Sequence, residues 1–127
     1  MMKPGMEVLA ISLGGACGAL LRYYIAVASK ALITSEFSWG TFAANVLGCF
    51  LIGLMIGSQR DQNETIRLGF GIGFLGSLTT FSTFSAQTIN HLTGGNWMLG
   101  TINAVANLTC CLLATVAGIT LGRRLLG

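Results

Sequence analysis

Four long apolar stretches, separated by short polar segments, dominate this sequence. They cover about residues 8–28, 40–57, 68–89 and 98–121. An α-helix needs about 20 mostly apolar residues to cross the hydrocarbon core of a bilayer, and each stretch is close to that length. The pattern predicts an all-α membrane protein, in which residues 1–127 form a single domain of four transmembrane helices.

The composition excludes most soluble classes of protein. Charged residues make up 9% of the chain, against about 25% in a typical soluble domain. Seven Lys and Arg and four Asp and Glu are too few to cover the surface of a soluble protein of 127 residues. The net charge of +3 is also too small for a surface that follows nucleic-acid phosphates. We therefore expect membrane lipid around the chain, and neither an ordinary soluble enzyme nor a nucleic-acid partner.

The four cysteines lie inside the apolar stretches, where free Cys behaves as a small hydrophobic residue; they are Cys17, Cys49, Cys110 and Cys111. No Cys-x-x-Cys spacing occurs in the sequence, and a single His does not complete a zinc site. The sequence therefore predicts neither disulfides nor a zinc centre.

The basic residues of the loops predict an orientation. Four spans place both termini and the second loop on one side of the membrane, and this side collects Lys3, Arg60, Arg67, Arg123 and Arg124. The opposite side has Lys30, with Arg22 inside the first span. Loops rich in Lys and Arg stay in the cytoplasm. We therefore expect cytoplasmic termini in the cell's inner (plasma) membrane.

Each span carries one pair of glycines four positions apart. The pairs are Gly14 and Gly18, Gly53 and Gly57, Gly69 and Gly73, and Gly118 and Gly122. This small-xxx-small spacing lets helix backbones approach closely in a membrane. The pairs are compatible with packing inside the chain or with contact to a second subunit.

The third stretch is unusually polar, since six hydroxyl side chains occur between Ser77 and Ser85. Gly76 followed by hydroxyl residues predicts a break near the middle of the third helix. A break frees carbonyl oxygens, which suit a hard cation such as sodium. The alternative is that Ser and Thr bond back to their own helix and that the neighbouring Phe side chains face lipid.

Every span contains a polar side chain at membrane depth. These residues are Arg22, Asn45, Gln87, Asn103 and Asn107. Each could be a simple hydrogen bond between helices, but their presence in all four spans indicates a polar path. No acidic residue lies deep in a span, which favours an anion or a neutral solute over a proton-coupled substrate.

Three segments resemble the Fluc (CrcB-like) family of fluoride channels. They are Gly14–Tyr23, Gly40–Gly48 and Gly73–Ser85, the last of which contains the run Thr-Thr-Phe-Ser-Thr-Phe-Ser at 79–85. This run is long and unusual, and the resemblance extends over essentially the whole chain.

The resemblance implies a fluoride-selective channel that exports cytoplasmic fluoride passively, and not an enzyme. It implies an antiparallel, dual-topology dimer with two pores. It also implies a structural sodium ion at the dimer interface, held by backbone carbonyls at positions that match Gly76 and Thr79.

The family's pore residues match particular positions of this chain. The pore phenylalanines match Phe81 and Phe84, the pore amide matches Asn45, and the polar track matches Ser82 and Thr83. The chain departs from the family pattern at three positions: amide and thiol side chains replace fourth-helix hydroxyls, and an amide replaces an acid. These residues are Asn107, Cys111 and Gln87.

Two other functions and a second kind of dimer stay open. A small four-span dual-topology exporter would need a carboxylate inside the membrane, and a non-transporting assembly subunit would need only the glycine pattern. Dual topology also requires nearly balanced loop charges, whereas this chain has five Lys and Arg on one side against Lys30 on the other, or against Lys30 plus Arg22. A homodimer is favoured because the chain carries nearly all of the pore motifs, and a related partner subunit is the alternative.

Overall fold

The computed structural model describes residues 4–58 and 63–126. Within these ranges every regular element is helical, which confirms the all-α part of the prediction. The elements, in chain order, are α1 (Pro4–Leu32), α2 (Trp39–Gly57), α3 (Glu64–Ile66), the π-helix η1 (Arg67–Leu75), α4 (Gly76–Leu78), α5 (Phe81–Thr93) and α6 (Trp97–Leu126). We call α3, η1, α4 and α5 together the third segment. Lys3 and Arg60, which count toward the predicted orientation, lie outside the described residues.

Three helices, α1, α2 and α6, are long and apolar enough to cross a membrane. Two of them extend past the predicted spans, since α1 covers Pro4–Leu32 and α6 covers Trp97–Leu126. The added turns carry Lys30 at the end of α1 and two arginines at the end of α6, where cations complement the helix dipole. Apolar stretches end at such residues, but backbone hydrogen bonds continue through them.

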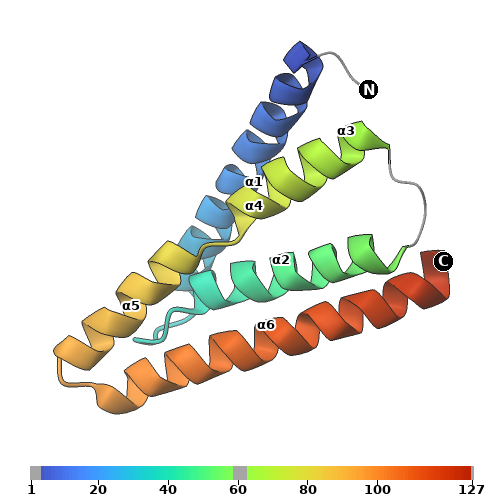
Figure 1. The fold of residues 1–127 in the computed structure, drawn as a ribbon. Coiled ribbons are helices and arrows are strands. Elements are labelled where there is room, and N and C mark those ends of the chain that lie inside the picture. Colours follow the sequence, from blue (N-terminus) through green and yellow to red (C-terminus); the bar gives the residue numbers. More distant parts are fainter. Residues whose placement is uncertain (1–3, 59–62, 127) are drawn as a thin grey trace.

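The helices form two pairs whose members run in the same direction (Figure 1). α2 lies beside α6, and α1 lies against η1 and α4. α5 continues the third segment across α6. The amino end of α1 and the carboxyl end of α6 lie at the same end of the molecule, which is the arrangement that four crossings produce.

Glycines bring α1 and η1 together at backbone distance. A methyl group on Gly14 would overlap the Gly69 carbonyl, and one on Gly18 would overlap the Phe74 carbonyl. A methyl group on Gly73 would lie 2.5 Å from the carbonyl oxygen of Ile11. Both glycine pairs of this contact therefore pack within the chain.

The remaining two glycine pairs join α2 to α6 in a fixed register. Facing residues keep a constant separation of 62 positions; the pairs are Gly53 with Thr115, Gly57 with Ile119, and the hydrogen-bonded Asn45 with Asn107. A constant separation means that the two helices run in the same direction and meet once per turn. Of the two interpretations of the glycine spacing, packing inside the chain is the one the structure shows.

The apolar core of the single chain is small. Ala44, Leu75 and Leu78 are buried at its centre, between α2, η1 and α4. Many large apolar side chains instead point outward from α1 and α6, among them Leu13, Leu20, Leu112, Leu113 and Val116. An apolar outer surface of this kind fits lipid or another subunit.

We predict that Gly118→Ala destabilises the fold. The added methyl group would overlap the Phe50 carbonyl, and overpacking of a tight contact costs about 1–3 kcal/mol. Thermal unfolding of the purified protein in detergent measures the effect. Gly5→Ala is the matched control, because no atom lies within 4 Å of the added group there. Equal melting temperatures for the two variants would contradict the close approach of α2 and α6.

Candidate functional site

The third segment is broken at Thr79 and Thr80, as the sequence predicted for its middle. Both residues are extended, with φ −81° and ψ 151° at Thr79 and φ −148° and ψ 107° at Thr80. The break lies three residues beyond Gly76, which is itself helical. The reason is that extended backbone needs no glycine and suits β-branched Thr.

Side chains from other helices hold the break open. The Thr80 backbone N–H donates to Oδ1 of Asn45 at 2.8 Å, and Nδ2 of Asn45 donates to the Thr80 carbonyl at 3.4 Å. The amide of Asn45 therefore supplies an acceptor for the Thr80 N–H, which has no helical partner at the break, and a further donor to the Thr80 carbonyl. A backbone group at membrane depth requires such a partner.

Arg22 has a structural partner at the same break. Its Nε donates to the Ser77 carbonyl oxygen at 3.0 Å. In a continuous helix this carbonyl would accept from residue 81, but the break removes that donor. The guanidinium group thus lies at the break and not in a loop. Arg22 therefore does not count among the loop charges on the side of the membrane opposite the termini, where the sequence analysis placed Lys30.

Gly76 and Thr79 lie on the wall of a cavity of about 280 Å³ between α2 and the third segment. The regular helical donor to the Gly76 carbonyl is the Thr80 N–H, which is bound by Asn45. The donor to the Thr79 carbonyl is the Thr83 N–H, which is bound by the Thr80 hydroxyl at 3.3 Å. Both carbonyls therefore lose their usual partners, as a cation site built from backbone oxygen requires.

A chain of amides connects α6 to the break. Nδ2 of Asn107 donates to Oδ1 of Asn103 at 3.1 Å, and Nδ2 of Asn45 donates to Oδ1 of Asn107 at 3.3 Å. At its other end, Nδ2 of Asn103 donates to the Thr88 hydroxyl at 2.8 Å. Asn103 and Asn107 are 1% and 3% exposed. Asn45, Asn103 and Asn107, which the sequence placed in two spans, thus form one network.

Hydroxyl groups extend this network into α5. The Thr80 hydroxyl donates to Oγ1 of Thr83 at 2.9 Å and lies 3.4 Å from Oγ of Ser82. Thr80 also caps the first turn of α5. The predicted track residues Ser82 and Thr83 are therefore grouped around Thr80, which the sequence analysis did not single out.

The two phenylalanines flank a second cavity, of about 240 Å³. The ring centroids of Phe81 and Phe84 are 5.5 Å apart with the planes at 60°. Phe84 is 7% exposed, whereas Phe81 is 75% exposed. Asn45, Asn107 and Cys111 also line this cavity, so the structure brings most of the predicted pore residues to one place. We call this space the pore cavity.

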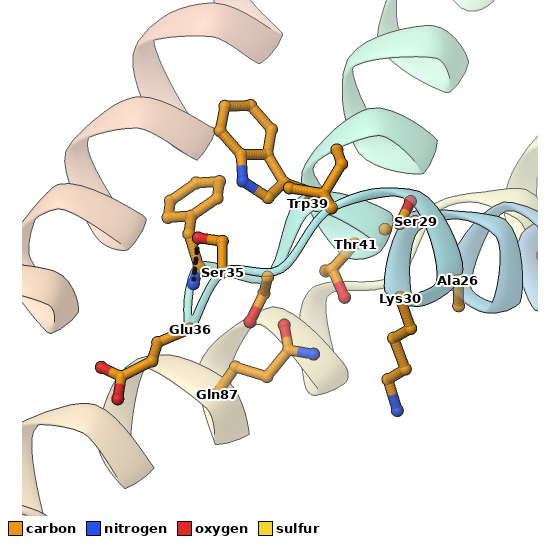
Figure 2. A pocket seen from close by; sticks show the side chains of 12 residues that line it. Ala26, Ser29, Lys30, Ser35, Glu36, Trp39, Thr41 and Gln87 are labelled. Carbon is orange, nitrogen blue, oxygen red and sulfur yellow. Dashed lines mark hydrogen bonds between the residues drawn. The ribbon is translucent and has the colours of Figure 1, made fainter.

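Two adjoining cavities lie on the other side of the break. One, of about 360 Å³, is lined by Arg22, Lys30, Thr80, Thr83 and Gln87, among others. The next, of about 170 Å³, lies under the loop between α1 and α2 (Figure 2). Figure 2 shows Gln87 of α5 facing Thr41 of α2. Oε1 of Gln87 is buried without a hydrogen-bond partner in the described part of the chain. The larger cavity is lined by residues of α1, of α2 and of the third segment at its break. We call it the vestibule.

Besides Thr80, two residues of the site escaped the sequence analysis for a common reason. Cys49 lines the pore cavity, and Thr88 ends the amide chain. Each lies four residues from a predicted site residue on the same helix, Cys49 from Asn45 and Thr88 from Phe84. The four-residue spacing of a helix face was the signal that could have found them.

Similarity to known proteins extends over nearly the whole chain. The sequence profile described as "CrcB-like protein, Camphor Resistance (CrcB)" matches residues 9–119. A relative from Geobacter sulfurreducens is 43% identical over 121 residues, which are 93% of this chain and 98% of the relative. One from Clostridium perfringens is 42% identical over 125 residues, 96% and 98% of the two chains. One from Shewanella baltica is 41% identical over 114 residues, 88% and 92%.

All three relatives carry the name "Fluoride-specific ion channel FluC". They are named as channels and not as enzymes. The match confirms the resemblance drawn from the Thr-Thr-Phe-Ser-Thr-Phe-Ser run. Together with helices long and apolar enough to cross a bilayer, it makes the protein a multi-pass membrane protein, and the chain belongs to the CrcB-like family.

Proposed function

We propose that the protein is a fluoride-selective channel of the plasma membrane that lets cytoplasmic fluoride leave passively. The observation that carries the proposal is the continuous set of neutral donors from Asn103 through Asn107 and Asn45 to Thr80 and Thr83. This set runs from α6 through α2 to the start of α5, and none of the described Asp or Glu residues lines the pore cavity. The names of the relatives give the ion.

The chemistry of these donors suits fluoride. A small, strongly hydrated anion enters a pore only where other donors replace its water. Amide N–H and hydroxyl groups supply such donors, and they add no fixed positive charge that would trap the ion. The edges of Phe81 and Phe84 add a weak positive potential, because the ring quadrupole is negative only on the faces.

The vestibule has the charge that an anion entrance needs. Arg22 and Lys30 both line it, and no carboxylate does among the described residues. A cleft lined by one sign of charge raises the local concentration of the opposite ion. Thr80 lines the vestibule as well as the pore cavity. An anion in the vestibule would therefore meet the hydroxyl cluster first.

Two antiparallel copies of the chain form the functional unit in this proposal, with two pores. One chain leaves Phe81 75% exposed, so a second subunit is needed to enclose the aromatic wall. Because Arg22 lies at the break and not in a loop, loop charge favours one orientation. We favour a homodimer that tolerates this bias; a related partner subunit with the opposite bias is the alternative.

A structural sodium ion at the dimer interface completes the proposal. The Gly76 and Thr79 carbonyls have lost their regular donors, and both residues border an open cavity. Four such oxygens from two copies would form a hard-oxygen site of the kind that small monovalent cations prefer.

Purified protein in liposomes should release fluoride when a potassium gradient sets the membrane potential. Release should proceed without a proton gradient, because no intramembrane carboxylate is available to carry a proton. A fluoride electrode measures the rate. Equal release of chloride, or strict dependence on a proton gradient, would refute a fluoride-selective channel.

Phe81→Ile and Phe84→Ile should each slow fluoride release about two- to thirteenfold. Each change removes the ring edge but keeps most of the bulk, and an aromatic edge contributes about 0.5–1.5 kcal/mol, which corresponds to that range in rate. Phe37→Ile serves as the control. Phe37 lies in the loop between α1 and α2, packs on Trp39 and does not line the pore cavity. Normal rates in both test variants would support side chains that only face lipid.

Gly76→Leu should prevent dimer assembly while the single chain keeps its fold. A side chain at Gly76 meets no atom within 4 Å in one chain, so a defect reports on the interface and the sodium site. Size-exclusion chromatography with light scattering gives the assembly state, and circular dichroism gives the helix content. Gly5→Leu is the matched control, because Gly5 is equally open. A normal Gly76→Leu dimer would contradict the proposed position of the sodium ion.

A further inference from the structure

Two cysteines from different helices meet at the wall of the pore cavity. Cys49 of α2 and Cys111 of α6 both line this cavity. Asn45 and Asn107, which are hydrogen-bonded to each other, line the same cavity. Both cysteines are free and partly buried. The proposed fluoride pathway gives Cys49 no role.

The register of α2 and α6 places the two thiols together independently of the shared cavity wall. Cys49 and Cys111 are separated by 62 positions, like the hydrogen-bonded Asn45 and Asn107 one turn before them. The pair one turn later, Gly53 and Thr115, keeps the same separation and touches at backbone distance. The thiols thus occupy the turn between two close contacts, so neither helix can move away from the other there.

We propose that Cys49 and Cys111 form a two-thiol site for a soft monovalent metal ion, Ag(I) or Cu(I), and that an ion bound there obstructs the pore cavity. Thiolate sulfur is the ligand that soft ions of this class prefer. Two facing thiols supply both ligands of a two-coordinate site. The obstruction rests on the proposed channel function, whereas the metal site itself does not.

Binding exchanges protons for the metal ion without any redox step. The two S–H bonds break, both protons leave to the solvent, and two sulfur–metal bonds form. One monovalent cation between two thiolates leaves a net charge of −1 at the site. This charge faces the same cavity as Asn45 and Asn107, so a bound ion would repel fluoride as well as narrow its path.

Silver nitrate in chloride-free buffer provides the test on the full-length protein. The reference protein is Cys17→Ala/Cys110→Ala, which removes the two cysteines that do not line the pore cavity. Cys49→Ser and Cys111→Ser are then added to it singly, because Ser keeps a small polar donor but is a poor ligand for silver. Circular dichroism and size-exclusion chromatography check folding, and Cys49→Ala and Cys111→Ala replace any Ser variant that fails this check.

Elemental analysis after gel filtration should find one silver ion per chain in the reference protein. Each Ser variant should lose at least about tenfold in silver affinity, since one of the two soft ligands is gone. Unchanged affinity in either variant would overturn the site. In liposomes, saturating silver should reduce fluoride release by the reference protein to below about a tenth of its silver-free rate, because pore width and local charge control passage.

The two measurements separate failure of the site from failure of the proposed function. Each variant's release with silver is compared with its own silver-free rate. Fluoride release that silver leaves unchanged in the reference protein would overturn the obstruction. If no form releases fluoride without silver, the channel function and the obstruction fall together, and the affinity comparison alone decides for or against the metal site.

Discussion

The interior of this protein depends on the pair of hydrogen bonds between the Asn45 side chain and the Thr80 backbone. An interrupted helix inside a membrane exposes peptide groups that lipid cannot satisfy. Asn45 bonds both the N–H and the carbonyl of Thr80, and Arg22 bonds the Ser77 carbonyl. With these partners supplied by α2 and α1, the third segment can change direction at 79–80 and direct its hydroxyl groups toward the vestibule and the pore cavity.

The position of Asn45 depends in turn on how closely α2 and α6 pack. Glycines at 53, 57, 118 and 122 remove the side chains that would separate the two backbones. The resulting register brings Asn107 to within 3.3 Å of Asn45. Asn45 is therefore held from two sides, by the break and by α6. Small residues thus determine where the polar residues of the neighbouring turns can act.

The sequence predicted the elements of the fold well, because apolar stretches of membrane length and paired glycines are local patterns. It also predicted a break near the middle of the third segment, from Gly76 and the hydroxyl residues that follow it, and the break lies at Thr79 and Thr80. Glycine marks where a helix is weak, whereas Asn45, 35 positions away in the chain, decides where this helix opens. The π-helical turns of η1 (Arg67–Leu75) were not predicted either, since no residue pattern separates them from α-helical turns. The pore residues were named through family resemblance; the chain of hydrogen bonds that joins them required coordinates.

The constant separation of 62 positions between α2 and α6 has a consequence for changes in chain length. Inserting or deleting one residue within either helix would rotate everything beyond it by about 100°, and the amides, thiols and glycines would no longer face their counterparts. A change of length in the loop at 33–38 or in the turn at 94–96 leaves this pairing intact, because it alters only the path between elements. Loops of this protein can therefore gain or lose residues, while the stretch from Asn45 to Gly57 and its counterpart on α6 have a fixed length.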